Sequence, residues 1–297
     1  MCRWLSVLLL VPTIAAAQVD GQLPAYLLQL PDSVRTVLVA ETSKSALHRI
    51  KHGPDGAAYV DERYMSIGQN GVGKQRAWDR RTPLGIYFVT DELDTTRLHE
   101  KYGPVAFPLD YPNIWDRINK RSGDGIWIHG VDESAGRRPP LDTDGCIALP
   151  NQDILAIEAE LLPVITPVII ARQVRWVSPE EIAATRDALK AELATWANSV
   201  ETGDLHRYLS MYAKDFGYRG MTRDEWARYR TGTLGAMTID EFVLEDVLLL
   251  ADPEESGLFL SRFRQIIVEA GREIVTTKRL YWRRTESGFE IVAEDDG

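Results

Sequence analysis

One cysteine and one histidine of this sequence could together perform nucleophilic chemistry. His129 ends the segment Gly-Ile-Trp-Ile-His, and Cys146 follows seventeen residues later in the segment Gly-Cys-Ile-Ala-Leu. An imidazole can lower the pKa of a neighbouring thiol, and the thiolate can attack a carbonyl carbon, which is the minimal set for acyl transfer. Such a pair is more often a coincidence, because cysteine is usually a core residue and histidine a satisfied polar one. The rest of the sequence must therefore support the hypothesis.

The segments around both residues have the pattern of short β-strands. Trp127 and His129 alternate with two isoleucines, so they would share one face of a strand. The segment that contains Cys146 follows a polar loop and also predicts a strand. A loop of this length can fold back, and we expect it to bring the thiol and the imidazole together.

The N-terminus has the pattern of a secretory signal peptide. A short basic start precedes an apolar run and an Ala-Ala-Ala-Gln segment, so residues 1–17 are predicted to be removed. The apolar run is about half as long as the roughly 20 residues that a membrane span requires. We therefore expect an exported, periplasmic protein without a membrane span. Removal would leave Cys146 as the single cysteine, and an unpaired thiol in an oxidising compartment suggests a nucleophile.

The composition excludes several classes of function. A hydrophobic content of 44% and a charged content of 26% are typical of a globular protein, and the net charge of −10 does not favour binding to nucleic acid. One histidine and one cysteine are fewer than the three or four protein ligands of a zinc site, so no metal and no organic cofactor is expected. The Gly-rich segment that ends at Lys74 is followed by Gln75, not by the Ser or Thr of a phosphate-binding loop.

Patterning divides the chain into two domains. Residues 18–33 are predicted to be an N-terminal linker, and residues 34–172 contain many short strands between Gly and Pro turns, typical of a mostly-β domain. Capping boxes at Ser178 and Thr222 predict two helices, and alternating segments over 242–250, 258–270, 273–282 and 289–292 predict strands. Residues 178–297 are therefore expected to form a second, small α+β domain, and the whole chain an α+β protein.

Residues 34–171 resemble the catalytic domain of the L,D-transpeptidases (YkuD type), which remodel the peptides of the bacterial cell wall. The Thr-Pro-x-Gly-x-Tyr segment precedes the histidine, and a Thr-x-Gly-Cys segment follows it, in the order typical of the family. The matching segments are Gly71–Lys74, Arg81–Tyr87, Tyr102–Gly103, Tyr111–Asn113, Gly125–Gly130 and Thr143–Cys146. The resemblance implies that the substrates are peptidoglycan stem peptides, with a wall-linked lipoprotein as a further candidate partner.

Residues 178–297 resemble a cone-shaped domain of the nuclear-transport-factor-two (SnoaL-like) type. The matching residues are Trp196, Gly203–Leu205, Tyr208–Tyr212, Asp215–Phe216, Phe263, Gln265 and Lys278–Trp282. Such a domain follows the catalytic domain in one subgroup of the transpeptidase-like proteins. The resemblance implies a protein or ligand partner for residues 178–297, or a packing surface alone.

The resemblance to the transpeptidases also implies a role for each residue of the site. Cys146 would be the nucleophile and His129 the base, which a backbone carbonyl would orient. Backbone N–H groups over residues 144–146 would form an oxyanion hole, with Gly145 allowing a tight turn. Thr143 would brace this turn by hydrogen bonding, and Asp144 would do the same or contact substrate.

The sequence departs from the family pattern after the cysteine. Many members carry an arginine two residues later, where it is thought to meet a substrate carboxylate, but this chain has Ala148. Arg137 or Arg138, in the preceding loop, could bind a carboxylate instead, unless both are simply solvated. Gly130 and Tyr111, within matching segments, are further predicted substrate contacts.

Three functions therefore follow from the sequence. The first is an exported L,D-transpeptidase that forms a thioester on Cys146. The second is a cysteine hydrolase or amidase of the same fold, which cleaves peptidoglycan–lipoprotein or stem-peptide links. The third is a non-catalytic cell-wall-binding protein, which is disfavoured because both chemical groups are present. The loss of the arginine at position 148 leaves open whether an amine or water resolves the thioester.

Overall fold

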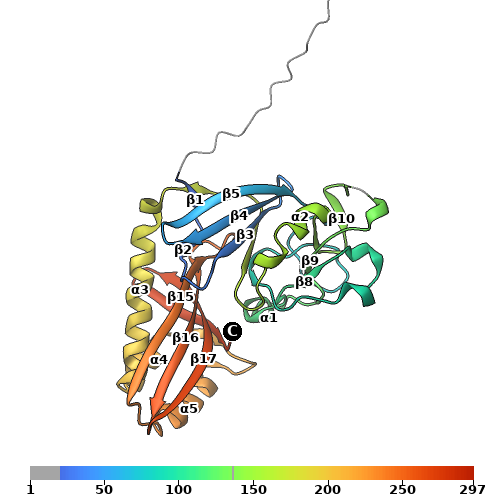
Figure 1. Ribbon diagram of the computed structural model, residues 1–297. Helices are drawn as coiled ribbons and strands as arrows, with labels where there is room; N and C mark the ends of the chain where they lie inside the picture. The colour runs from blue at the N-terminus through green and yellow to red at the C-terminus, as the bar shows by residue number, and fades with distance from the viewer. Residues whose placement is uncertain (1–20, 136) are drawn as a thin grey trace, which may run out of the picture.

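A computed structural model describes residues 21–135 and 137–297, which form two domains joined along one side (Figure 1). The predicted signal peptide, residues 1–17, lies outside the described residues. Strands are the main regular elements of the first domain, whereas the longer helices belong to the second. The predicted α+β class is confirmed. No helix in the described ranges combines the length and the apolar character needed to cross a membrane.

The first domain is built on a five-stranded sheet with the order β5-β4-β3-β12-β7. Its central strands β3 and β12 run parallel, with Val39 opposite Ile169, and both side chains are fully buried. Burial on both faces explains why these strands are continuous apolar runs in the sequence. The bounds are β3 (Thr36–Glu41), β4 (Ala46–Gly53), β5 (Gly56–Tyr64), β7 (Gly85–Phe88) and β12 (Pro167–Ala171).

A smaller three-stranded sheet with the order β11-β9-β8 lies beside it and contains the residues of interest. Its strands are β8 (Ala106–Pro108), β9 (Trp127–His129) and β11 (Ile147–Ala148). The pair β6 (Ile67–Gly68) and β10 (Leu141–Thr143) runs parallel next to it. Short helices complete the domain: α1 (Ile114–Ile118), α2 (Asn151–Leu155), and the 3₁₀ turns η1 (Thr95–Arg97), η2 (Glu100–Tyr102), η3 (Glu133–Ala135) and η4 (Glu158–Glu160).

The second domain is a six-stranded sheet, with the order β14-β18-β17-β16-β15-β2, against which the long helix α3 packs (Figure 1). Both predicted capping boxes are confirmed, at Ser178 for α3 and at Thr222 for α5. Trp196, Trp226 and Trp282 are completely buried in its core. The bounds are α3 (Pro179–Glu201), α4 (Leu205–Ser210), β14 (Tyr212–Gly217), α5 (Arg223–Leu234), β15 (Glu241–Ala251), β16 (Leu258–Glu269), β17 (Arg272–Thr285) and β18 (Gly288–Asp295).

The segment predicted to be a linker, 18–33, contains two strands in its described part. β1 (Leu23–Pro24) pairs with β13 (Trp176–Val177), and β2 (Leu27–Gln29) extends the sheet of the second domain through β15. Ala25 and Leu28 are buried in the core of that domain. The segment is too short to show periodicity. Its partner strands, β13 and β15, lie far along the chain, so the local sequence could not reveal the pairing.

The two domains share an apolar core at their junction. Phe88 and Ile169 of the first domain belong to the same buried cluster as Leu250 and Tyr281 of the second. The indole Nε1–H of Trp115 also donates to Glu255 across the junction at 3.0 Å. These contacts hold the second domain directly against the first.

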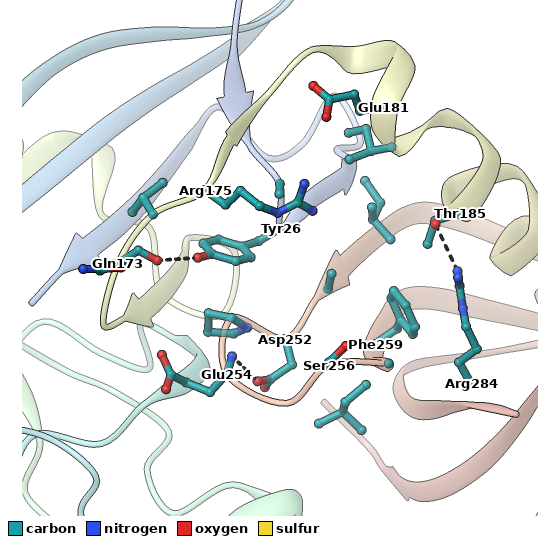
Figure 2. A pocket seen from close by; sticks show the side chains of 18 residues that line it. Tyr26, Gln173, Arg175, Glu181, Thr185, Asp252, Glu254, Ser256, Phe259 and Arg284 are labelled. Carbon is teal, nitrogen blue, oxygen red and sulfur yellow. Dashed lines mark hydrogen bonds between the residues drawn. The ribbon is translucent and has the colours of Figure 1, made fainter. Parts of the chain in front are cut away.

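A cavity of about 730 Å³ opens between the start of α3, the N-terminal strands and the β15–β16 turn (Figure 2). The Tyr26 hydroxyl donates to the carbonyl oxygen of Gln173 at 2.8 Å on one side. The Arg284 guanidinium donates to the Thr185 hydroxyl at 3.0 Å on the other. Neither Cys146 nor His129 lines this cavity, so it is distinct from the site described next.

Candidate active site

The strand register places Cys146 and His129 on one face of the small sheet. β11 runs parallel to β9, with Ala148 opposite His129, and Cys146 immediately precedes β11. Alternation along both strands then directs the side chains of Cys146, Trp127 and His129 to the same face. All three line one cavity of about 970 Å³.

The His129 ring is buried and held by a backbone carbonyl. Its Nδ1 lies 2.5 Å from the carbonyl oxygen of Gly130. Because a carbonyl only accepts, Nδ1 must hold the proton, which leaves Nε2 with a lone pair. The edge of the ring packs on Tyr102 at 5.1 Å between centroids. Burial lowers the pKa of His129 to about 4, so the ring is neutral at physiological pH and can accept a proton.

The Cys146 thiol is buried and protonated. Its Sγ donates a hydrogen bond to the carbonyl oxygen of Gly125 at 3.3 Å, and only 8% of the residue is exposed. Burial raises the pKa of the Cys146 thiol to about 11. Since both pKa shifts favour uncharged groups, the resting pair is a neutral thiol and a neutral imidazole, not a thiolate–imidazolium ion pair.

This assignment predicts slow alkylation of Cys146 at neutral pH. The thiolate fraction, and with it the labelling rate, should keep rising up to about pH 11, because the raised pKa favours the thiol below that value. The measurement is iodoacetamide labelling as a function of pH, followed by mass spectrometry of the peptide that contains Cys146. Urea-unfolded protein is the control and should titrate near pH 8.5. A folded-state midpoint below pH 8 would contradict the neutral pair.

A tight turn before Cys146 is fixed by two threonine hydroxyls. Thr143 Oγ1 donates to the carbonyl oxygen of Cys146 at 2.7 Å and accepts the Gly145 N–H at 3.1 Å. Thr82 Oγ1 donates to the carbonyl oxygen of Gly145 at 2.9 Å. Gly145 has φ +130°, and a Cβ there would lie 2.8 Å from the backbone oxygen of Arg81. Only glycine fits this position.

The structure leaves fewer N–H donors for the predicted oxyanion hole than the three residues 144–146 would offer. The Gly145 N–H is occupied by Thr143, whereas the Cys146 N–H has no hydrogen-bond acceptor within residues 21–135 and 137–297. The Cys146 N–H is therefore the donor that remains available beside the thiol.

Replacing Thr143 by valine should loosen this turn. The change keeps the shape but removes a donor and an acceptor, leaving the Gly145 N–H and the Cys146 carbonyl without their partner. We expect the free energy of unfolding to fall by about 1–3 kcal/mol and the activity to fall by a further factor of about 10 to 100. Chemical denaturation and turnover measure the two effects. Thr143→Ser keeps the hydroxyl and should retain both the stability and the activity. Equal losses in Thr143→Val and Thr143→Ser would argue against a role of the hydroxyl in holding the turn.

Charged side chains of both signs line this cavity. Lys74, Arg80, Lys101 and Arg138 line it together with Asp124, Asp142 and Asp144. Three ion pairs join these residues, and each is longer than a normal hydrogen bond. The Asp144 carboxylate lies 3.8 Å from Nε of Arg80 and 3.6 Å from Nζ of Lys101, and an Arg138 nitrogen lies 3.7 Å from the Asp142 carboxylate. The nitrogens thus keep hydrogen-bonding capacity for an anionic ligand.

The structure brings some of the predicted site residues together and places others elsewhere. Besides the Cys–His pair, the cavity contains Thr143, Asp144 and Arg138. The Arg137 guanidinium instead lies 3.7 Å from the centre of the Tyr64 ring, outside the lining. Tyr111 is a core residue, whose hydroxyl donates to the Ser122 carbonyl oxygen at 3.1 Å.

Gly130 has a steric role in addition to its carbonyl. A Cβ at this position would lie 2.5 Å from the Asn151 side-chain oxygen. That oxygen accepts the Val131 N–H at 2.7 Å and so fixes the backbone that follows His129. Asn151 is also the first residue of α2, which has Pro150 at its N-cap position.

The cavity residues that were not predicted as site residues include Lys74, Trp78 and Lys101. Lys74 and Trp78 belong to the loop before Thr82, for which the sequence analysis predicted no contact with substrate. A tryptophan among four charged residues, Arg76, Asp79, Arg80 and Arg81, was the available signal. No sequence signal indicated Lys101, because its position depends on how the turn η2 folds over the small sheet.

Fold and site together define a two-domain protein in which a cysteine and a histidine face one cavity with a charged lining. Residues 39–170 match the L,D-transpeptidase catalytic domain (YkuD), and residues 188–295 match the Cds6 C-terminal NTF2-like domain. The chain therefore belongs to the L,D-transpeptidase-like proteins that carry a C-terminal NTF2-like domain.

Two solved structures share this architecture over nearly their whole length. Bd1075 of Bdellovibrio bacteriovorus is 23% identical with a TM-score of 0.76, over 92% of this chain and 97% of that one. The helical cell shape determining protein Pgp2 of Campylobacter jejuni is 20% identical with a TM-score of 0.73, over 90% and 96%. At these identities the likeness shows the fold alone. No curated protein matches the sequence significantly.

Proposed function

We propose that the protein is an exported cysteine acyltransferase that acts on peptidoglycan stem peptides through a thioester on Cys146. The observation that carries this proposal is the β9–β11 register, which directs Cys146 and His129 into one cavity. The match of the first domain to the L,D-transpeptidase family supplies the substrate class. The same family indicates a location in the cell envelope.

The first half of the reaction cleaves the stem peptide. The thiol turns from the Gly125 carbonyl toward Nε2 of His129, which takes the proton as sulfur attacks the substrate carbonyl carbon. The C–S bond forms, and the Cys146 N–H donates to the developing oxyanion. His129 then returns the proton to the leaving amine as the C–N bond breaks, which leaves a thioester.

The second half transfers the acyl group. An amine or a water molecule attacks the thioester while His129 accepts its proton, the C–S bond breaks, and the thiol is regenerated. With an amine the protein is a transpeptidase, and with water it is a hydrolase of the same bond. The polar, charged lining of the cavity admits either acceptor.

The cations explain how a stem peptide without a family-type arginine could be held. Ala148 is buried and bonded through its backbone to Ser66, so it presents no charge to substrate. Arg138 and Lys101, which both line the cavity, would bind the free carboxylate of the terminal residue that leaves. Arg138 thus takes the role for which the sequence offered Arg137 as an equal candidate.

The proposal is tested by mass spectrometry of the products from disaccharide-tetrapeptide, with Cys146→Ala as the matched control. Cross-linked dimers formed by the natural protein alone would establish transpeptidation. Trimmed stems without cross-links, again absent with the variant, would establish hydrolysis. Identical products from both proteins, also with lipoprotein-linked wall fragments, would overturn the catalytic proposal and favour a wall-binding role.

A role in cell shape is proposed by analogy with the structural neighbour Pgp2, a helical cell shape determining protein. An enzyme that trims or links stem peptides alters the local connectivity of the wall. Deletion of the gene should change the cell form. Complementation with the natural protein should restore the form, whereas complementation with the Cys146→Ala variant should not.

A further inference from the structure

Trp78 is an exposed tryptophan on the rim of the catalytic cavity. Its residue exposure is 93%, the highest among the large hydrophobic residues of the described chain, and it lines the same cavity as Cys146. Most exposed apolar side chains need no explanation, but a tryptophan at the mouth of a site presents a large, flat face to whatever enters.

The loop that presents Trp78 is held by the half-buried carboxylate of Asp79. Asp79 accepts the Nζ–H of Lys74 at 2.8 Å and the backbone N–H groups of Gln75, Arg76 and Arg81 at 2.8, 3.1 and 3.1 Å. Burial alone would raise the pKa of Asp79, but these donors lower it to about 2, so the carboxylate is charged at every physiological pH.

The backbone at Trp78 adopts an uncommon conformation. Trp78 and Arg80 have φ +63° and +55°, in the left-handed region that residues other than glycine rarely occupy. Such geometry persists where the surroundings enforce it, and it is frequent at sites that hold a ligand. A further hydrogen bond connects the loop to the opposite wall of the cavity: the Ser122 N–H donates to the Gln75 carbonyl oxygen at 3.0 Å.

We propose that Trp78 is a stacking platform for a sugar ring of the glycan strand, placed to bind the part of the substrate that the reaction does not change. This inference rests on the proposed function and deepens it.

The order of groups in the substrate supports a sugar as the occupant. A stem peptide is attached to the glycan at its N-terminal end, whereas the bond that Cys146 attacks lies toward its C-terminal end. With the scissile carbonyl at the buried thiol, the glycan must therefore lie outside, at the rim. The charged groups of the peptide suit the lysines and arginines of the lining, but a neutral sugar needs an aromatic face on which its apolar C–H groups can pack.

The test compares two substrates that differ only in the sugar. Steady-state cleavage of disaccharide-tetrapeptide and of the free tetrapeptide is measured with the natural chain, Trp78→Ala and Trp78→Phe. We expect the natural chain to favour the glycan-bearing substrate by about ten-fold in kcat/KM, mainly through KM, and Trp78→Ala to lose this preference. Trp78→Phe should keep most of it, and all three should cleave the free peptide equally.

A matched control separates stacking from general loss of an aromatic ring. Tyr229→Ala removes another exposed ring, 48% accessible, from α5 in the second domain, and should leave the preference unchanged. Because the Trp78 ring is exposed, Trp78→Ala should melt at the same temperature as the natural chain. An equal substrate preference in Trp78→Ala and the natural chain would overturn the proposal, and so would an equal loss on both substrates.

Binding distinguishes failure of this inference from failure of the proposed function. If the natural chain cleaves neither substrate, calorimetric titration of Cys146→Ala with both compounds gives the same comparison without turnover. Tighter binding of the glycan-bearing compound that disappears in Cys146→Ala/Trp78→Ala would still support the platform. Equal binding of the two compounds by Cys146→Ala would overturn it.

Discussion

Replacing Cys146 by alanine is expected to reduce turnover of stem peptides by at least about 10⁴-fold. The proposed reaction passes through a bond to sulfur, and removal of a nucleophile from a working set typically costs most of the rate enhancement. The residual rate should come only from substrate binding and from the backbone N–H at position 146. Product formation from disaccharide-tetrapeptide, followed by mass spectrometry, measures the loss.

The fold should survive this change, which makes the comparison clean. The Cys146 side chain donates a long hydrogen bond to the Gly125 carbonyl oxygen, whereas the turn before it is held by Thr143 and Thr82. The thermal midpoint of Cys146→Ala should therefore remain within a few degrees of the natural value. Cys146→Ser, which keeps a donor of similar size, should be equally inactive at neutral pH, because a hydroxyl is a much weaker nucleophile there. Substantial activity in either variant would contradict the thioester.

Much of the fold could be predicted because its signals are local. The capping boxes at Ser178 and Thr222 lie within one turn of the helices that they begin, and both are present. The N-terminal strands could not be predicted, because β2 is defined by its pairing with Leu249 and Leu250. The apolar residues of that segment have no periodicity that distinguishes a linker from an edge strand.

The site was predictable to the extent that strand alternation defines it. Alternation placed Trp127 and His129 on one face, and the parallel register added Cys146. Alternation could not show that Tyr111 points into the core or that Arg137 stacks on Tyr64, since both depend on how loops fold. Loop residues such as Lys74 and Trp78 line the cavity because hydrogen bonds to Asp79 fix the shape of their loop. These bonds join residues four or five positions apart outside any helix or strand, so no sequence periodicity indicates them.

Burial explains why the two candidate catalytic groups differ from a thiolate–imidazolium pair. The cavity removes water from both side chains, which raises the pKa of Cys146 and lowers that of His129. A protonated thiol resists oxidation better than a thiolate does. In the proposed reaction, proton transfer to His129 accompanies attack by sulfur, so the position of the imidazole matters more than its charge.

Replacing His129 by glutamine is accordingly expected to reduce turnover by about 10³-fold or more while substrate binding is retained. Glutamine fills most of the same volume but cannot accept and return a proton at neutral pH. Product formation under saturating disaccharide-tetrapeptide measures the loss, and calorimetric titration checks binding. The natural chain should also keep kcat/KM nearly constant from pH 7 to 5 and lose it as the pH falls through about 4, where the imidazole becomes protonated. An unperturbed histidine would lose activity near pH 6.5 instead.

The variant should lack this acid limb, because it has no imidazole to protonate. A control for acid unfolding is the circular dichroism of both proteins over the whole pH range of the activity profile, including the values below pH 4. If the natural profile falls near pH 6.5 while the fold is intact, the buried neutral imidazole is wrong. If His129→Gln retains both the rate and the acid limb, another residue acts as the base, and the hydrogen bond from Nδ1 to the Gly130 carbonyl serves only to pack the ring.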